Sequence, residues 1–331
     1  MSELSNLKRP SIDPPTTRWV GIDEAGYGPN LGPLVMTAVI AEGPADRPPS
    51  LWNDLAGRIA RAGCADYRLW VDDSKRVYSS GRGRDRLEAA TFAALAACGV
   101  KFAYFGGLLS AVGADEAAHK ALCDWLEGRN FVLPTPSSQA IVDAAIQARP
   151  FDDAPWRLIQ IQSVILDAGA FNQQLDKCHS KADLHFDVFA RLLRPLVEWE
   201  GLTSVRGDKH GGRHYYQAHL ASAFPDRTVD RVEESPGRSR YVIRGDKDDA
   251  RLSLELTPRA DADDGLVALA SIVSKTIREL WMEAFNSFWS RRVPGIRPTA
   301  GYPQDARRFR SLIEESASQL ALDPSGWWRR K

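Results

Sequence analysis

The hydrophobic pattern along the chain consists of short strand-like runs and longer helical segments. Near the N-terminus, the apolar run 19–22 stops at two acidic residues and a glycine-rich turn, and the β-branched run 34–40 predicts the second strand of a hairpin. Between residues 266 and 288, apolar residues recur in steps of three and four, which predicts a long amphipathic helix. Further runs predict strands at 100–105, 158–164, 202–205, 241–243 and 252–256, and helices at 84–97 and 182–197. This mixture indicates an α/β domain whose mixed β-sheet is flanked by helices.

The same pattern suggests how the chain is organised. At 331 residues, it is long enough for two domains or for one large domain with additions. Residues 1–17 are polar and contain proline, so we expect a flexible leader, followed by a main domain over 18–310. The stretch 106–156 has four prolines around short helical pieces, which we interpret as an insertion and not as part of the core. Residues 311–331 are predicted to form a C-terminal helical tail.

Composition excludes several classes of protein. Apolar residues make up 44% of the chain and charged residues 26%, and the net charge is zero, so the chain is neither disordered nor polybasic. Four cysteines without a C-x-x-C pair argue against a disulfide framework and against a zinc knuckle. No apolar stretch is long enough to cross a bilayer, and the N-terminus lacks the apolar run of a secretory signal. We therefore expect a cytoplasmic protein with no membrane partner.

Acidic residues stand at the ends of predicted elements. Asp23 and Glu24 end the first strand, Asp208 ends another, and Asp261 precedes the long helix. A sheet can bring strand ends that are distant in sequence to one edge, where functional residues commonly collect. Carboxylates held together repel one another unless a cation lies among them, and oxygen-only ligands favour magnesium or manganese. Such ions keep positions open for water and phosphate, which suits phosphodiester hydrolysis.

The sequence leaves more than one role open for these acidic residues. Adjacent residues on a strand point to opposite faces, so Asp23 and Glu24 share an ion only if the strand ends or twists there. Asp208 could cap a turn, and Asp263 and Asp264 fit N-cap residues of the long helix better than they fit ligands. The glycine-rich turn does not match a dinucleotide-binding fingerprint, because its spacing is longer and a strand follows it.

Four motifs, in order along the chain, resemble those of type 2 ribonucleases H, the ribonuclease HII and HIII families. The matching segments are GIDEAGYG (21–28) with GPLV (32–35), DSK (73–75), ASIVSK (270–275) and GYP (301–303). The resemblance covers roughly residues 18–105 and 157–310. It implies a ribonuclease H-like mixed β-sheet flanked by helices for the catalytic domain, which carries the insertion and the extended C-terminal helical part.

The resemblance also implies an activity and the residues that perform it. The expected protein is a metal-dependent endoribonuclease that binds an RNA–DNA hybrid and hydrolyses its RNA strand with two divalent ions, Mg²⁺ or Mn²⁺. The residues implied to be catalytic and to bind both ions are Asp23, Glu24, Asp208 and Asp261. The residues implied to contact the substrate are Gly26, Tyr27, Gly28, Ser74, Lys75 and Tyr302. Asp246 competes with Asp208 as the third carboxylate, and we favour Asp208 because it ends a strand.

The chain departs from the families' pattern in two places. Tyr27 stands where ribonuclease HII has arginine, and Thr299-Ala300 stands where it has His-Lys. A divergent member is therefore implied, and the choice between single-ribonucleotide junctions and longer hybrids stays open. The alternative is a catalytically inactive or altered-substrate nucleic-acid-binding protein on the same fold. Protein partners, the ion used in the cell and the role of the insertion are not predicted, and a monomer is assumed.

Overall fold

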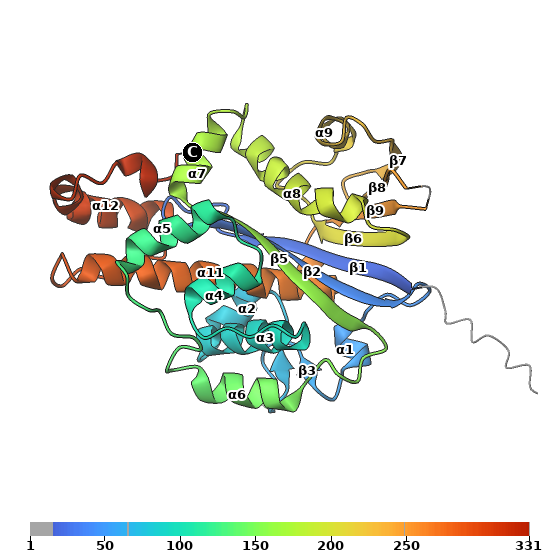
Figure 1. The fold of residues 1–331 in the computed structure, drawn as a ribbon, viewed down its shortest axis with the longest axis horizontal. Coiled ribbons are helices and arrows are strands. Elements are labelled where there is room, and N and C mark those ends of the chain that lie inside the picture. The colour runs from blue at the N-terminus through green and yellow to red at the C-terminus, as the bar shows by residue number, and fades with distance from the viewer. Residues whose placement is uncertain (1–15, 65, 248, 331) are drawn as a thin grey trace, which may run out of the picture.

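A seven-stranded mixed sheet forms the centre of the computed structural model, which describes residues 16–64, 66–247 and 249–330 (Figure 1). The strand order is β5-β2-β1-β6-β9-β8-β7. The strands are β1 (Thr16–Ala25), β2 (Leu34–Pro44), β5 (Arg157–Leu166), β6 (Leu202–Asp208), β7 (Val229–Glu234), β8 (Ser239–Arg244) and β9 (Arg251–Thr257). A separate two-stranded ribbon pairs β3 (Ile59–Ala60) with β4 (Leu69–Trp70). The predicted α/β class with a mixed sheet flanked by helices is confirmed.

Strand pairing decides which residues meet at the sheet edge. The hairpin of β1 and β2 is antiparallel, as predicted, and so is the pair β8–β9. In contrast, β1 pairs with β6 in parallel, and its register places Ile22 beside Gly207. Because the two strands run in the same direction, Asp23 and Asp208, one residue further along, reach the same edge.

Helices cover both faces of the sheet. On one face, α11 (Gly265–Ser290) packs on β1 and β2 with α3 (Gly83–Ala97) behind it, and on the other face lies α8 (Lys181–Val197) (Figure 1). The other long helix is α12 (Pro303–Gln319). The shorter helices are α1 (Leu51–Asp54), α2 (Ser74–Ser79), α4 (Phe105–Ala111), α5 (Glu116–Leu126), α6 (Gln139–Ala148), α7 (Ala168–Leu175), α9 (Gln217–Ala223) and α10 (Ala260–Asp263). None of the helices in the described ranges is long and apolar enough to span a membrane.

The start of α11 is fixed closely against β1. Asp264 is its N-cap, with a carboxylate that accepts hydrogen bonds from the backbone N–H groups of Leu266 and Val267, as expected for this residue. A Cβ on Gly21 would lie 2.2 Å from the carbonyl carbon of Leu266, so only glycine lets the helix approach the strand this closely. The predicted long helix is confirmed, and its first turn lies next to the acidic end of β1.

Two expectations about the region between α3 and β5 are wrong. Residues 100–105 form no regular strand; Tyr104 makes a single antiparallel bridge with Val132, and α4 begins at Phe105. The predicted insertion 106–156 contains α4, α5 and α6, and its apolar side chains Leu108, Trp125 and Val142 are buried in the same core as α3 and α11. This segment is therefore packed into the hydrophobic core. The reason is that its helices are short but amphipathic, and each of them buries one face.

Both ends of the main domain differ in detail from their predicted bounds. β1 begins at Thr16, so this strand includes the last two residues assigned to the leader, and residues 1–15 lie outside the described residues. At the other end, α12 runs from Pro303 to Gln319 and therefore crosses the predicted boundary at residue 310.

Candidate functional site

A cavity of about 320 Å³ lies at the edge of the sheet where β1 and β6 end. Its lining includes the four acidic side chains singled out from the sequence: Asp23, Glu24, Asp208 and Asp261. It also includes the six expected substrate-contacting residues: Gly26, Tyr27, Gly28, Ser74, Lys75 and Tyr302. The structure thus brings together side chains from β1, β6, α2, α10 and the start of α12 that are distant in the chain.

Asp208 is held in the cavity wall by backbone donors. Its Oδ1 accepts hydrogen bonds from the N–H groups of Lys209 at 2.8 Å and Arg259 at 2.7 Å. Arg259 precedes α10, which carries Asp261 into the same cavity. The competing residue Asp246 lies outside the cavity, where its exposed carboxylate pairs with Arg227. The placement therefore favours Asp208 over Asp246 as the third acidic residue.

Asp23 and Glu24 contact helices on different faces of the sheet, but their carboxyls interact directly. Asp23 hydrogen-bonds Ser271 of α11, and Ser274 of the same helix donates to the Asp23 backbone oxygen at 3.1 Å. Glu24 faces α8, and its Oε2 lies 3.5 Å from Nε2 of His185. A hydrogen bond between the two carboxyls helps to lower the pKa of Glu24, so the strand period of two does not keep them apart at the end of β1.

Burial and mutual repulsion shape the titration of the cluster. Burial, and then the charge of Glu24, raise the pKa of Asp23 well above its usual value. Burial also raises the pKa of Asp208 against the effect of its backbone donors, and burial followed by the charges of Asp73 and Asp208 raises that of Asp261. For Glu24, burial alone would raise the pKa, but the hydrogen bond and charge of His185, together with hydrogen bonds from Asp23 and the backbone, outweigh it, and the net shift is downward. Three of the four carboxyls therefore resist ionisation unless a cation compensates them.

Positive side chains flank this acidic cluster. The charge of Lys75 acts to lower the pKa of Asp261, so its ammonium lies close enough to interact with the carboxylate. Lys275 lines the cavity, pairs with Glu279 and lies 4.5 Å from the ring centroid of Tyr78. The cavity therefore combines acidic and basic walls, as binding of metal ions together with phosphate would require.

The donor set fits a hard cation, although no closed cage exists. Within the described part of the chain, no three His, Cys, Asp or Glu side chains are gathered closely enough to hold one ion. Magnesium is commonly bound by one or two carboxylates, with waters and substrate phosphate completing its coordination. The four carboxylates, which offer only oxygen ligands, thus fit an open site that the substrate completes.

Several side chains at the site were not among the predicted residues. Ser271 lies within the ASIVSK segment, and Arg278 follows Lys275 by one turn of α11, so a helical projection of this motif would have indicated both. His185, which contacts Glu24, also lines a side chamber of about 240 Å³ with Tyr27. No local pattern indicates His185, because its position depends on how α8 packs on the sheet.

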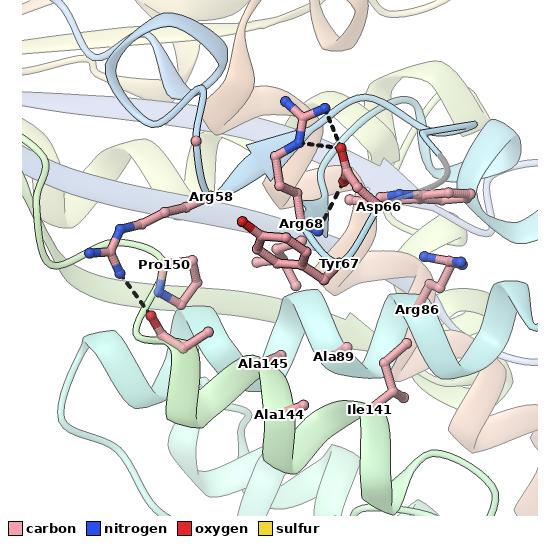
Figure 2. Close-up of a pocket in the computed structure, with 14 residues that line it drawn as sticks. Arg58, Asp66, Tyr67, Arg68, Arg86, Ala89, Ile141, Ala144, Ala145 and Pro150 are labelled. Atoms are coloured by element: carbon pink, nitrogen blue, oxygen red, sulfur yellow. Dashed lines mark hydrogen bonds and ion pairs between the residues drawn. The ribbon is translucent and has the colours of Figure 1, made fainter.

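A larger cavity of about 660 Å³ lies elsewhere, between α6, α3 and the segment that leads into β4 (Figure 2). Figure 2 shows the small side chains Ala144 and Ala145 of α6 opposite the ring of Tyr67. Of the described residues that line it, Asp66 is the one acid, and it is paired with Arg68. This cavity therefore lacks the groups that phosphodiester hydrolysis requires.

No family model and no curated protein matches the chain. Among solved structures, it is similar to ribonuclease H2 from Pyrococcus horikoshii OT3, with 15% identity, a TM-score of 0.45 and coverage of 94% of this chain and 92% of that chain. It is also similar to a chain of the PCNA:RNase HII complex from Archaeoglobus fulgidus, with 14% identity, a TM-score of 0.40 and coverage of 95% of this chain and 94% of that chain. A third similar structure is Bst-RNase HIII in complex with Mn²⁺, with 14% identity, a TM-score of 0.40 and coverage of 95% of this chain and 66% of that chain. At these identities and TM-scores, the likenesses do not decide the activity, which has to be inferred from the cavity residues.

Proposed function

We propose that the protein is a metal-dependent endoribonuclease that hydrolyses the RNA strand of RNA–DNA hybrids. The observation that carries this proposal is the meeting of Asp23, Glu24, Asp208 and Asp261 on one cavity, although they come from three distant parts of the chain. Raised pKa values at three of these carboxyls support a site that is completed by cations. Of the motifs that resemble type 2 ribonucleases H, the first contributes Asp23 and Glu24, and Asp261 precedes the ASIVSK segment.

In this proposal, the four carboxylates hold two divalent ions, Mg²⁺ or Mn²⁺. When bound, such ions supply a water-derived nucleophile and neutralise charge that develops on the phosphate and the leaving 3′-oxygen. Asp208, fixed by two backbone N–H groups, keeps one wall of the site rigid. The carboxyls of Asp23 and Glu24 interact with each other in the cavity, so both residues can contribute to the same ion.

The remaining lining residues are suited to hold the nucleic acid. Lys75, with Ser74 beside it, is placed to contact a backbone phosphate. Tyr302 is 51% exposed, so its ring is available to lie against a sugar or a base. The turn Gly26-Tyr27-Gly28 brings backbone groups to the cavity, where they can approach a ribose; its 2′-hydroxyl is the group that distinguishes RNA from DNA.

A cleavage panel tests the proposal. The purified protein is supplied with Mg²⁺ or Mn²⁺ and with labelled RNA–DNA hybrid, duplex RNA and a DNA duplex that contains one ribonucleotide. We expect cleavage of the hybrid to 5′-phosphate and 3′-hydroxyl ends, and loss of cleavage in Asp23→Asn with the fold retained. Asp246→Asn removes a carboxylate outside the cavity and should cleave normally. If neither ion supports cleavage of any substrate, the enzymatic proposal is wrong.

A second candidate is a catalytically inactive or altered-substrate nucleic-acid-binding protein on the same fold. It is motivated by tyrosine in place of arginine at position 27 and by the finding that, in the described ranges, no three His, Cys, Asp or Glu side chains are gathered around one ion position. It predicts hybrid binding that weakens steeply with salt, without metal-dependent cleavage of hybrid. Calorimetry that detects no Mg²⁺ or Mn²⁺ binding, with or without hybrid, would favour this candidate over the nuclease.

A further inference from the structure

The end of the described chain lies directly behind the glycine-rich turn. The Arg329 side chain has no exposed surface, and its guanidinium donates hydrogen bonds to the backbone oxygens of Gly26 at 2.5 Å, Tyr27 at 3.2 Å and Gly32 at 3.4 Å. The Arg329 backbone N–H donates to the Asn30 oxygen at 2.8 Å, and the Asn30 side chain donates back at 3.0 Å. One residue therefore contacts the turn from one end to the other, across about 300 positions of sequence.

The segment that carries Arg329 is itself anchored. The side-chain amide of Asn172 in α7 donates to the backbone oxygens of Ser325 and Trp328, each at 2.8 Å. Trp327 is buried in the core, and the guanidinium of Arg329 lies 4.1 Å from the ring centroid of Phe171. Arg329 thus reaches the turn from a rigid base and not from a freely moving end.

Peptide geometry determines how this contact orients the N–H groups on the cavity side of the turn. In a planar trans peptide, the N–H points away from the C=O of the same unit. The Gly26 and Tyr27 oxygens point toward Arg329. The N–H groups of the same two peptide units belong to Tyr27 and Gly28, so they point to the opposite side, toward the cavity. Both residues line the cavity, and a Cβ on Gly28 would meet no protein atom within 4 Å. In the described ranges, neither N–H has a hydrogen-bond acceptor.

The charge on Arg329 does not reach the cavity side of the turn, because the Arg329 side chain is buried behind it. Burial, and then the neighbouring charge of Arg278, lower the pKa of Arg329 to about 9, so the guanidinium stays protonated at neutral pH. Arg278 binds the same region from α11, by donating to the backbone oxygens of Ala300 at 2.6 Å and Leu31 at 3.4 Å. Tyr27 brings no cation to the cavity, whereas Arg329 and Arg278 both act on the backbone of this region.

We propose that Arg329 is a positioning residue that holds the Tyr27 and Gly28 N–H groups toward the cavity, where they bind an acceptor oxygen of the nucleic acid. The inference rests on the proposed function for the identity of the ligand, but the restraint of the turn does not depend on catalysis. A ribose hydroxyl and a phosphate oxygen are both acceptors for such a pair of donors. Comparison of RNA–DNA hybrid with DNA duplex separates the two, because both carry phosphates and only the hybrid carries the hydroxyl.

The test uses Arg329→Met in the full-length chain, with Arg330→Gln as the matched control. Arg330 is the next residue, and its half-exposed side chain pairs with Asp176 and does not contact the turn. Arg329→Met should raise KM about tenfold, as expected for the loss of one or two well-aligned hydrogen bonds, and should change kcat less. Binding of this variant to hybrid and to DNA duplex is measured in calcium. If the acceptor is the ribose hydroxyl, binding to hybrid should weaken more than binding to DNA duplex, and if the acceptor is phosphate, both should weaken equally.

Hydrogen exchange supplies a readout that needs no activity. The N–H groups of Asn30 and Leu31 donate to the Gly301 oxygen, and their exchange should become faster in Arg329→Met and stay unchanged in Arg330→Gln. If the methionine variant does not fold, Arg329→Lys replaces it, because lysine keeps the charge but offers one donor group. The KM and the exchange rates of Arg329→Lys should lie between those of the wild type and those expected for Arg329→Met. Unchanged KM and unchanged exchange in a folded Arg329 variant would overturn the inference.

Failure of the proposed function gives a different result. If the wild-type protein cleaves no nucleic acid, the proposed activity is wrong, but faster exchange confined to residues 26–32 in Arg329→Met still supports the restraint of the turn. If the wild type cleaves hybrid while the Arg329 variants keep normal KM and normal hybrid preference, the activity stands and the positioning role falls.

Discussion

Replacing Asp23 by asparagine should stabilise the metal-free protein at the cost of its activity. The carboxyl of Asp23 is buried, and burial together with the charge of Glu24 raises its pKa well above the usual value. The folded protein therefore favours the protonated form. The resulting contribution to stability is present at pH values below the unfolded-state pKa and is lost as pH rises through the folded-state pKa. Asparagine is neutral at every pH and avoids this loss.

The size of the effect can be scaled from the chain itself. Each pKa unit of displacement corresponds to about 1.4 kcal/mol of stability. For 331 residues, the entropy of unfolding is about 0.7 kcal/mol/K, so each unit moves the melting temperature by about 2 °C. Binding of Mn²⁺ at a hundredfold excess over its Kd should stabilise the wild type by about 2.7 kcal/mol, which corresponds to about 4 °C.

Thermal melting in a chelator and in Mn²⁺, at pH 5 and pH 8, measures both effects. Metal-free Asp23→Asn should melt above the wild type at pH 8, the gap should shrink at pH 5, and Mn²⁺ should stabilise only the wild type strongly. Asp246→Asn, on the exposed pair with Arg227, should follow the wild type throughout. Equal melting temperatures of wild type and Asp23→Asn at pH 8 without metal, together with no response to Mn²⁺, would refute the placement of an uncompensated charge at this position.

Three further outcomes are expected. Gly28→Ala should leave the melting temperature unchanged, because its Cβ would meet no protein atom within 4 Å. It should nevertheless weaken hybrid binding in an anisotropy titration, and normal binding would mean that the substrate does not approach this backbone. His185→Phe should raise the pKa of Glu24, because the contact with His185 lowers that pKa. The acidic limb of the pH–rate profile should therefore move to higher pH, and an unmoved limb would exclude this contact from catalysis. Gly21→Ala should cost about 2–3 kcal/mol in urea unfolding, because the added Cβ would overlap the backbone of Leu266, and a loss below about 0.5 kcal/mol would contradict this close packing.

Much of the fold and of the acidic cluster was accessible from local patterns. Alternation and helical spacing predicted β1, β2 and α11, and the position of Asp208 at the end of a strand favoured it over Asp246. These features are encoded within a few neighbouring residues, where periodicity and turn chemistry act directly. The roles of the cavity residues stay predictions until the cleavage panel is carried out.

Several features depended on contacts that no local pattern contains. The contact of His185 with Glu24 depends on the packing of α8, and that of Arg329 with the turn joins opposite ends of the described chain. The stretch 100–105 has the composition of a strand, but it forms only one isolated bridge, from Tyr104 to Val132, before α4 begins. Whether β1 ends before or after Asp23 and Glu24, and therefore whether their carboxyls could meet, was not decidable from the sequence.

The parallel pairing of β1 with β6 has a consequence for biosynthesis. A ribosome releases β1 early, but its parallel neighbour follows only after β5, α7 and α8 have been made, and α10 and α11 come later still. Until then β1 is paired on one side only, by β2. Contacts between such distant segments form slowly, and an unpaired strand edge is prone to association with other chains. Slower translation or a lower growth temperature should therefore increase the soluble yield of this protein.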